Sequence, residues 1–171
     1  MTLRRMFVIV LMLLPLSGSC LFAQTVETDN IPDELLYTIS FGPFAQSYVL
    51  DGSMNPFYLR GDFDGDGKPD YAFWVKSKKT GETGIAIWLS SRHNFVILGA
   101  GTPFKASVSS VTNLDFLNRW QVYGKRPVER GVEAGPPPHL IGEAILVEKS
   151  ESASGLIYWS GKSFAWYQQG D

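Results

Sequence analysis

Four aspartates, three of them at alternate positions and the fourth four residues later, lie in the run Gly-Asp-Phe-Asp-Gly-Asp-Gly-Lys-Pro-Asp, which spans residues 61–70. Gly67 follows the third of them and permits a sharp turn, so the chain can fold back and bring the last aspartate near the first. Calcium binds six to eight oxygens at about 2.3 to 2.6 Å, and alternating carboxylates in a tight loop supply them. The loop is therefore predicted to bind Ca²⁺ through its positions 1, 3, 5 and 9, which are Asp62, Asp64, Asp66 and Asp70.

Charge repulsion supports the same interpretation. At an effective dielectric constant near 20, two carboxylates about 4 Å apart repel by on the order of 4 kcal/mol, and this loop would gather four of them. Without a cation the loop should open. Mg²⁺ prefers a rigid octahedron and retains its waters, and Zn²⁺ prefers His or Cys ligands, which the run lacks. The alternative, a solvated acidic turn, leaves the metal-binding spacing around Gly67 unexplained.

The run does not fit a helix-loop-helix calcium site, because position 12 is Phe73 instead of glutamate and both flanks favour strands. It resembles the calcium loop of FG-GAP repeats (VCBS, integrin-type), in which Asp-x-Asp-x-Asp-Gly-x-x-Asp lies within a hairpin. Gly61-Asp62-Phe63 and Asp70-Tyr71-Ala72 match that pattern. The resemblance covers about residues 59–76, and one copy cannot build the ring of a β-propeller. It implies five calcium ligands, one of them a backbone carbonyl: Asp62, Asp64, Asp66, the carbonyl of Lys68, and Asp70.

The elements around the loop are predicted to be strands, because short runs rich in aromatic and β-branched residues alternate with turn sequences. Their close spacing favours antiparallel pairing, since parallel strands need long crossovers. The predicted fold is mainly β, an α+β domain with one or two short helices and an antiparallel meander sheet or a small sandwich or barrel. The predicted strands are residues 57–60, 71–76, 84–89, 95–98, 119–123, 143–148, 156–159 and 163–168.

Four further segments have local signals. A short helix is predicted from Pro32 to about Ile39, because proline suits a first helical position, and Gly42-Pro43 should end it. Residues 112–117 could begin a second helix or form a loop. Residues 131–139 contain three consecutive prolines and should be an extended surface connection within the domain. A two-residue turn at Ser160-Gly161 should set Ile157 opposite Phe164 and Trp159 beside Trp166 on one core face.

The first 23 residues have the three-part layout of a secretory signal peptide: basic Arg4 and Arg5, an apolar stretch, and a break with small residues. The apolar stretch is too short to cross a bilayer. Cleavage after Ala23 is favoured, and cleavage before Cys20 with lipid attached to that cysteine is the alternative. Residues 1–23 are thus predicted to be a signal peptide and residues 24–171 a single domain that is secreted or periplasmic.

Composition limits the partners. Removal of the signal leaves 148 residues with 13 basic and 17 acidic side chains, a formal charge of −4, which argues against a nucleic-acid partner. The length suits one domain with a substantial core. The only cysteine is Cys20, so cleavage after Ala23 leaves no cysteine for a disulfide. No transmembrane segment is expected in the mature form.

Catalysis is the competing possibility. Ser91 and His139 could form a nucleophile pair, but no nucleophile-elbow motif accompanies them. A carboxylate pair for glycoside hydrolysis could be drawn from four glutamates, namely Glu129, Glu133, Glu143 and Glu148.

These observations predict an exported, non-catalytic calcium-binding module of the bacterial cell envelope, either structural or binding a protein or glycan partner. The alternative is a small secreted hydrolase directed at glycans and using acidic residues. An aromatic side chain exposed beside the acidic run, such as Trp74 or Trp88, would favour glycan binding.

Overall fold

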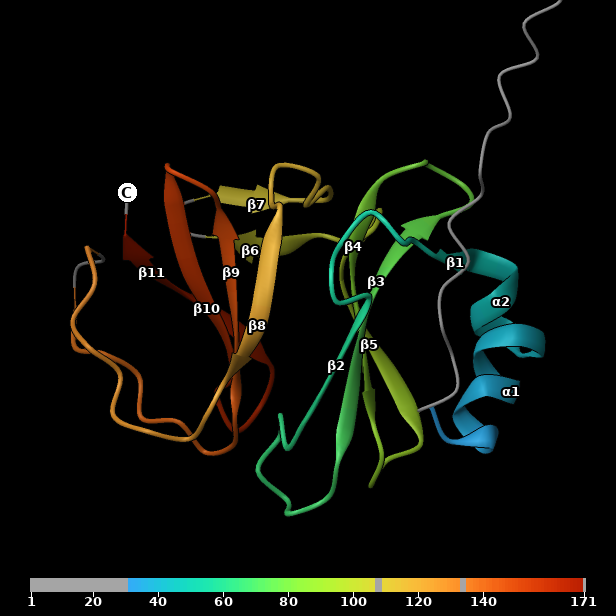
Figure 1. Ribbon diagram of the computed structural model, residues 1–171, viewed down its shortest axis with the longest axis horizontal. Helices are drawn as coiled ribbons and strands as arrows, with labels where there is room; N and C mark the ends of the chain where they lie inside the picture. Colours follow the sequence, from blue (N-terminus) through green and yellow to red (C-terminus); the bar gives the residue numbers. More distant parts are fainter. Residues whose placement is uncertain (1–30, 107–108, 133–134, 171) are drawn as a thin grey trace, which may run out of the picture.

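The computed structural model describes residues 31–106, 109–132 and 135–170. Two antiparallel sheets of five and four strands lie face to face, with a two-stranded ribbon beside them and two helices on the outer face of the larger sheet (Figure 1). The described strands do not close into a barrel. The mainly β, antiparallel, single-domain fold expected from the sequence is therefore confirmed. The predicted signal peptide lies outside the described residues.

The first sheet carries the acidic run. Its strand order is β1-β3-β4-β5, and β2 pairs with β3 on the same edge as β1. β3 is buried on both faces: Tyr71, Phe73 and Val75 face the helices, whereas Ala72 and Trp74 face the second sheet. The bounds are β1 (Tyr48–Leu50), β2 (Tyr58–Gly61), β3 (Asp70–Ser77), β4 (Thr83–Leu89) and β5 (Asn94–Gly99).

The second sheet has the order β11-β10-β9-β8. The main core lies between the two sheets, where Trp74 of β3 meets Trp120 of β8 edge to face at a centroid distance of 5.8 Å. A smaller cluster covers the outer face of this sheet. The bounds are β8 (Arg119–Tyr123), β9 (Ala144–Lys149), β10 (Ala153–Trp159) and β11 (Phe164–Gly170), and the separate ribbon is β6 (Phe104–Ala106) with β7 (Ser109–Val111).

The helices are α1 (Asp33–Phe41) and α2 (Pro43–Ser47). The predicted first helix is confirmed, and Gly42 ends it, but Pro43 begins a second helix instead of stopping the chain. Proline at a first helical position costs no hydrogen bond, which explains this restart. Residues 112–117 form no helix, because the Asn113 side chain accepts hydrogen bonds from the N–H groups of Thr83 and Asp115 and holds a turn.

The last hairpin differs from its predicted register. Trp159 pairs with Phe164 and Ile157 with Trp166, so the turn spans Ser160 to Ser163 instead of two residues. The Ser160 N–H and hydroxyl both donate to the Ser163 carbonyl, which closes the longer turn. Because the register moved by an even number of residues, the same four side chains still face the core, as predicted.

Candidate metal centre

The acidic loop, residues 62–69, joins β2 to β3 and lies at the lower edge of Figure 1. Gly61 pairs with Asp70, so the loop begins and ends at adjacent positions of one hairpin. Gly65 and Gly67 have φ angles of +78° and +84°, a backbone region in which residues with a side chain are strained. The two glycines therefore allow the tight path that returns the chain to Asp70.

Three of the predicted ligands come together in this loop. One carboxylate oxygen from each of Asp62, Asp64 and Asp70 lies within 4.8 Å of the other two. The Asp64 side chain is only 2% exposed and Asp70 is fully buried. Two oxygens bound to one calcium ion at about 2.4 Å can be at most about 4.8 Å apart, so these three fit a single coordination shell. The cluster can hold a metal ion.

Asp70 is fixed in place by backbone donors. Its Oδ2 accepts hydrogen bonds from the N–H groups of Phe63 (3.0 Å) and Asp64 (3.3 Å), and its Oδ1 accepts one from the N–H of Ser90 (2.9 Å). These contacts tie both ends of the loop to the β4–β5 turn. The carboxylate is thereby positioned for a ligand role, since Oδ1, which accepts a single hydrogen bond, retains a lone pair.

Two buried oxygens in the cluster have no partner among the described residues: Oδ1 of Asp62 and Oδ1 of Asp64. The other oxygen of Asp62 accepts a hydrogen bond from the Gly67 N–H at 3.0 Å. Burying an unsatisfied carboxylate oxygen is costly, and native folds rarely leave one without a partner. Both residues belong to the cluster that could hold a metal, and a cation bound there could serve as the partner of both oxygens.

The pKa values of the cluster reflect this burial. Burial raises the pKa of Asp70 to about 6, and the neighbouring charge of Asp64 adds to the rise, whereas the three backbone N–H donors oppose it. Burial also raises the pKa of Asp64, assisted by the charges of Asp66 and Asp62. The site therefore disfavours negative charge when no cation is present.

The remaining predicted ligands lie outside the cluster. Asp66 is exposed, its Oδ1 accepts the Lys68 N–H at 2.8 Å, and a hydrogen bond from the Ser91 side chain lowers its pKa. Lys68 is also exposed. The ligand roles of Asp66 and of the Lys68 carbonyl thus stay predictions.

The start of β9 closes over the acidic loop from the second sheet. The Asp62 N–H donates to Glu143 Oε2 (2.9 Å), and the Glu143 N–H donates to the Asp62 carbonyl (2.7 Å). A side chain at Gly142 would collide with the Asp62 carbonyl and the Gly65 backbone, and one at Gly65 would collide with Ile141. Residues 141–143 therefore clamp the loop at close backbone contact.

A second connection comes from the β4–β5 turn. One guanidinium nitrogen of Arg92 lies 3.6 Å from Asp64 Oδ2, and the same guanidinium lies over the Trp159 ring at 4.8 Å from its centroid. Arg92 partly neutralises Asp64 and lowers its pKa. It also links the β4–β5 turn of the first sheet to the end of β10. Neither Arg92 nor the clamp was identifiable from sequence, because no local pattern marks either.

The other sequence candidates are dispersed. Glu143 belongs to the clamp, whereas Glu148 lies near the opposite end of β9 and contacts Arg119 at 3.5 Å. Five residues of strand separate the two glutamates by about 16 Å, beyond the spacing of a glycosidase pair. Glu129 is exposed on the long β8–β9 connection, and Glu133 lies outside the described residues.

The candidate nucleophile pair is not joined either. In the part of the chain that the structure describes, no hydrogen bond connects Ser91 with His139, and Ser91 instead bonds Asp66. Trp74 and Trp88 are 2% and 7% exposed, so neither offers the open aromatic surface expected for glycan binding. Neither α1 nor α2 is long and apolar enough to cross a membrane.

Comparisons with family models, curated proteins and solved structures give no match to this chain. They supply no enzyme family, and nothing among the described residues points positively to catalysis. The functional assignment therefore rests on the cluster of Asp62, Asp64 and Asp70 and on the surfaces around it.

Proposed function

We propose that the protein is an exported, calcium-stabilised module of the bacterial cell envelope that acts without catalysis, as a structural domain or by binding a protein or glycan. The observation that carries the calcium assignment is the pair of buried, unpartnered oxygens on Asp62 and Asp64, two of the three aspartates whose carboxylates lie close enough together to share one ion. An ion there would convert a costly cluster of like charges into a crosslink between β2 and β3.

The donor set favours calcium among common divalent ions. The cluster offers carboxylate oxygens and neither His nor Cys, so Zn²⁺ and softer metals are poorly matched. Three carboxylates, a backbone carbonyl and waters can reach the six to eight ligands that calcium accepts. The resemblance to the FG-GAP calcium loop supports Asp66 and the Lys68 carbonyl as the further ligands. Asp66 would then exchange its contact with Ser91 for the ion.

Export agrees with this role. The signal-like layout of the first 23 residues would send the chain to a compartment where calcium reaches millimolar concentration. For a site with a Kd of about 10 μM, millimolar calcium stabilises the fold by about 2.7 kcal/mol. In a domain of this size that corresponds to a rise of about 5 to 10 °C in melting temperature.

The test is calorimetric titration of the calcium-free domain with Ca²⁺, paired with melting curves. We expect one site per chain, a higher melting temperature with calcium, and a weaker response to Mg²⁺. Asp64→Asn should abolish the calcium response while making the calcium-free protein more stable, because it removes a buried charge from the cluster. Asp115→Asn, an exposed aspartate on the loop before β8, is the matched control and should change neither property.

A calcium-free protein with the same melting temperature as the calcium-saturated protein would refute the assignment. So would an Asp64→Asn variant that retains the full calcium response.

A further inference from the structure

The long connection between β8 and β9 borders a hollow that is separate from the cluster of Asp62, Asp64 and Asp70. This connector, residues 124–143, contains no helix or strand in its described part and lies over the outer face of the second sheet (Figure 1). Loops of more than about 15 residues without secondary structure are uncommon in compact domains and are usually functional when they are ordered. The connector therefore needs a reason to be held in place.

Specific contacts order the connector. The Gly131 N–H donates to the Tyr167 hydroxyl at 3.0 Å, and the Gln169 side-chain amide donates to the Glu129 carbonyl at 3.3 Å. The Arg126 guanidinium lies over the Tyr123 ring, 4.2 Å from its centroid. Between these anchors the connector does not collapse onto the sheet. It leaves a hollow of about 410 Å³.

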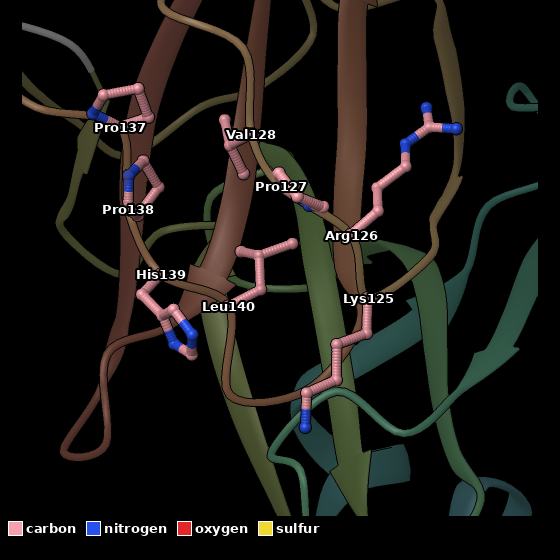
Figure 2. A pocket seen from close by; sticks show the side chains of 8 residues that line it. All are labelled: Lys125, Arg126, Pro127, Val128, Pro137, Pro138, His139 and Leu140. Atoms are coloured by element: carbon pink, nitrogen blue, oxygen red, sulfur yellow. The ribbon is translucent and has the colours of Figure 1, made fainter.

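The floor and walls of the hollow are apolar. Leu140 is buried and Val128 half-buried, and both belong to the cluster on the outer face of the second sheet. Figure 2 shows their side chains between one wall that contains Pro127 and another formed by Pro137 and Pro138. Prolines have a fixed φ angle, so these walls lose little conformational entropy when a ligand binds.

The rim of the hollow is lined by basic side chains. Lys125 and His139 lie on the same side of the opening in Figure 2, whereas the Arg126 guanidinium points away toward Tyr123. No carboxylate lines the hollow, and in the described part of the chain Lys125 has no carboxylate within 4.0 Å. An ammonium group without a partner beside an apolar floor complements a ligand with an anionic end and an apolar body.

We infer that this hollow binds a small hydrophobic carboxylate, with the carboxylate on Lys125 and His139 and the apolar body on Val128 and Leu140. A neutral sugar fits less well, because no Trp, Tyr or Phe side chain lines the hollow for a pyranose to stack on. The site contains none of the three clustered aspartates. Failure of one proposal therefore leaves the other standing.

The experiment uses octanoate as the probe and records amide chemical shifts of the calcium-saturated protein by NMR. For a ligand of ten non-hydrogen atoms we expect a Kd of about 1 mM. We expect saturable shifts at Lys125, Val128 and residues 139–140. Octanamide, which has the same chain without the charge, and acetate, which has the charge without the chain, should each bind about tenfold more weakly.

Two variants separate binding from folding. Lys125→Glu reverses an exposed charge at the rim and should weaken octanoate binding about tenfold, whereas Lys79→Glu, on the remote β3–β4 turn, should leave it unchanged. Val128→Phe fills the hollow and should block octanoate without altering the rim charge. Melting curves of each variant confirm that it folds.

The inference is overturned if octanoate gives no saturable shifts at ten times the expected Kd, or if its shifts map elsewhere. Equal binding of octanoate and octanamide, or unchanged binding by a folded Lys125→Glu protein, would also overturn it, because the rim charge would then play no part.

Discussion

The carboxylate of Glu143 accepts a hydrogen bond from the backbone N–H of Asp62, a residue 81 positions earlier in the chain. The return bond, from the Glu143 N–H to the Asp62 carbonyl, makes the contact reciprocal. The β2–β3 loop of the first sheet is thus held by the residue that directly precedes β9 of the second sheet. The geometry of the aspartate cluster therefore depends on how the two sheets pack, and not on the acidic loop alone.

Glu143→Ala should loosen the acidic loop. It leaves the Asp62 N–H without its acceptor, at a cost of about 1 to 3 kcal/mol for a partly buried group. We expect a lower urea midpoint both with and without calcium, together with weaker calcium binding. Glu143→Gln retains an oxygen acceptor and should recover most of the loss.

The matched control for this prediction is Glu129→Ala, on the exposed part of the connector. If both variants unfold at the wild-type urea concentration, the reciprocal contact contributes nothing to stability and the clamp is incidental.

The distance in sequence between Asp62 and Glu143 also explains which parts of the site could be predicted from the sequence and which could not. The aspartate spacing and Gly67 are local signals, and they led to Asp62, Asp64 and Asp70, which the structure brings together. The clamp and Arg92 depend on contacts between sheets, for which neither residue carries a local pattern. Glu143 was a plausible catalytic carboxylate by type alone, and only its position shows that it serves the loop.

The strands could likewise be predicted only where the local sequence signal is long enough. Those of four or more residues were predicted to within a few positions, because runs rich in aromatic and β-branched residues between turn sequences identify them. The three-residue strands β1, β6 and β7 were missed, since three residues are too few to show a period. The register of the last hairpin was wrong because it depends on which of two turns closes, and the Ser160–Ser163 hydrogen bonds decide that.

Stability should depend on pH through Asp70. Its pKa is about 6 in the fold and 3.8 ordinarily, so the folded protein holds this proton more tightly than the unfolded chain. Stability of the calcium-free protein should therefore fall as pH rises from about 4 to about 6, and then level off as far as this group is concerned. Calcium binds the deprotonated carboxylate, so its stabilising effect should be full above about pH 6 and decline below it.

Melting curves of calcium-free and calcium-saturated protein across that pH range test this dependence. Asp115→Asn is the control, because this exposed aspartate lies outside the cluster of Asp62, Asp64 and Asp70 and is not a proposed ligand. A calcium effect that is constant between about pH 5 and pH 7 contradicts the prediction.

Arg92→Ala should affect the calcium-free protein more than the calcium-bound protein. Arg92 is the cation that faces Asp64 in the absence of a metal, and it also stacks on Trp159. Its removal should destabilise the calcium-free fold by about 1 kcal/mol. Calcium affinity should rise several-fold, because the competing positive charge is gone.

Arg126→Ala serves as the control, since it removes a similar stacked guanidinium, over Tyr123, that is far from any metal ligand in sequence and contacts none of them. It should lower stability equally with and without calcium. If calorimetry gives Arg92→Ala a calcium affinity at or below that of the wild type, Arg92 does not oppose the ion.

Gly142→Ala tests the closest contact in the metal centre. A methyl group at this position would overlap the Asp62 carbonyl and the Gly65 N–H, both of which are backbone atoms that cannot move aside independently. The acidic loop would have to shift away from β9, which breaks the hydrogen bonds between Asp62 and Glu143 and displaces one ligand. We expect a loss of about 1 to 3 kcal/mol in the free energy of unfolding, together with weaker calcium binding.

Gly124→Ala is the matched control, because a methyl group there meets nothing within 4 Å. If Gly142→Ala binds calcium as tightly as Gly124→Ala, the acidic loop is positioned by its own hairpin and does not need the second sheet.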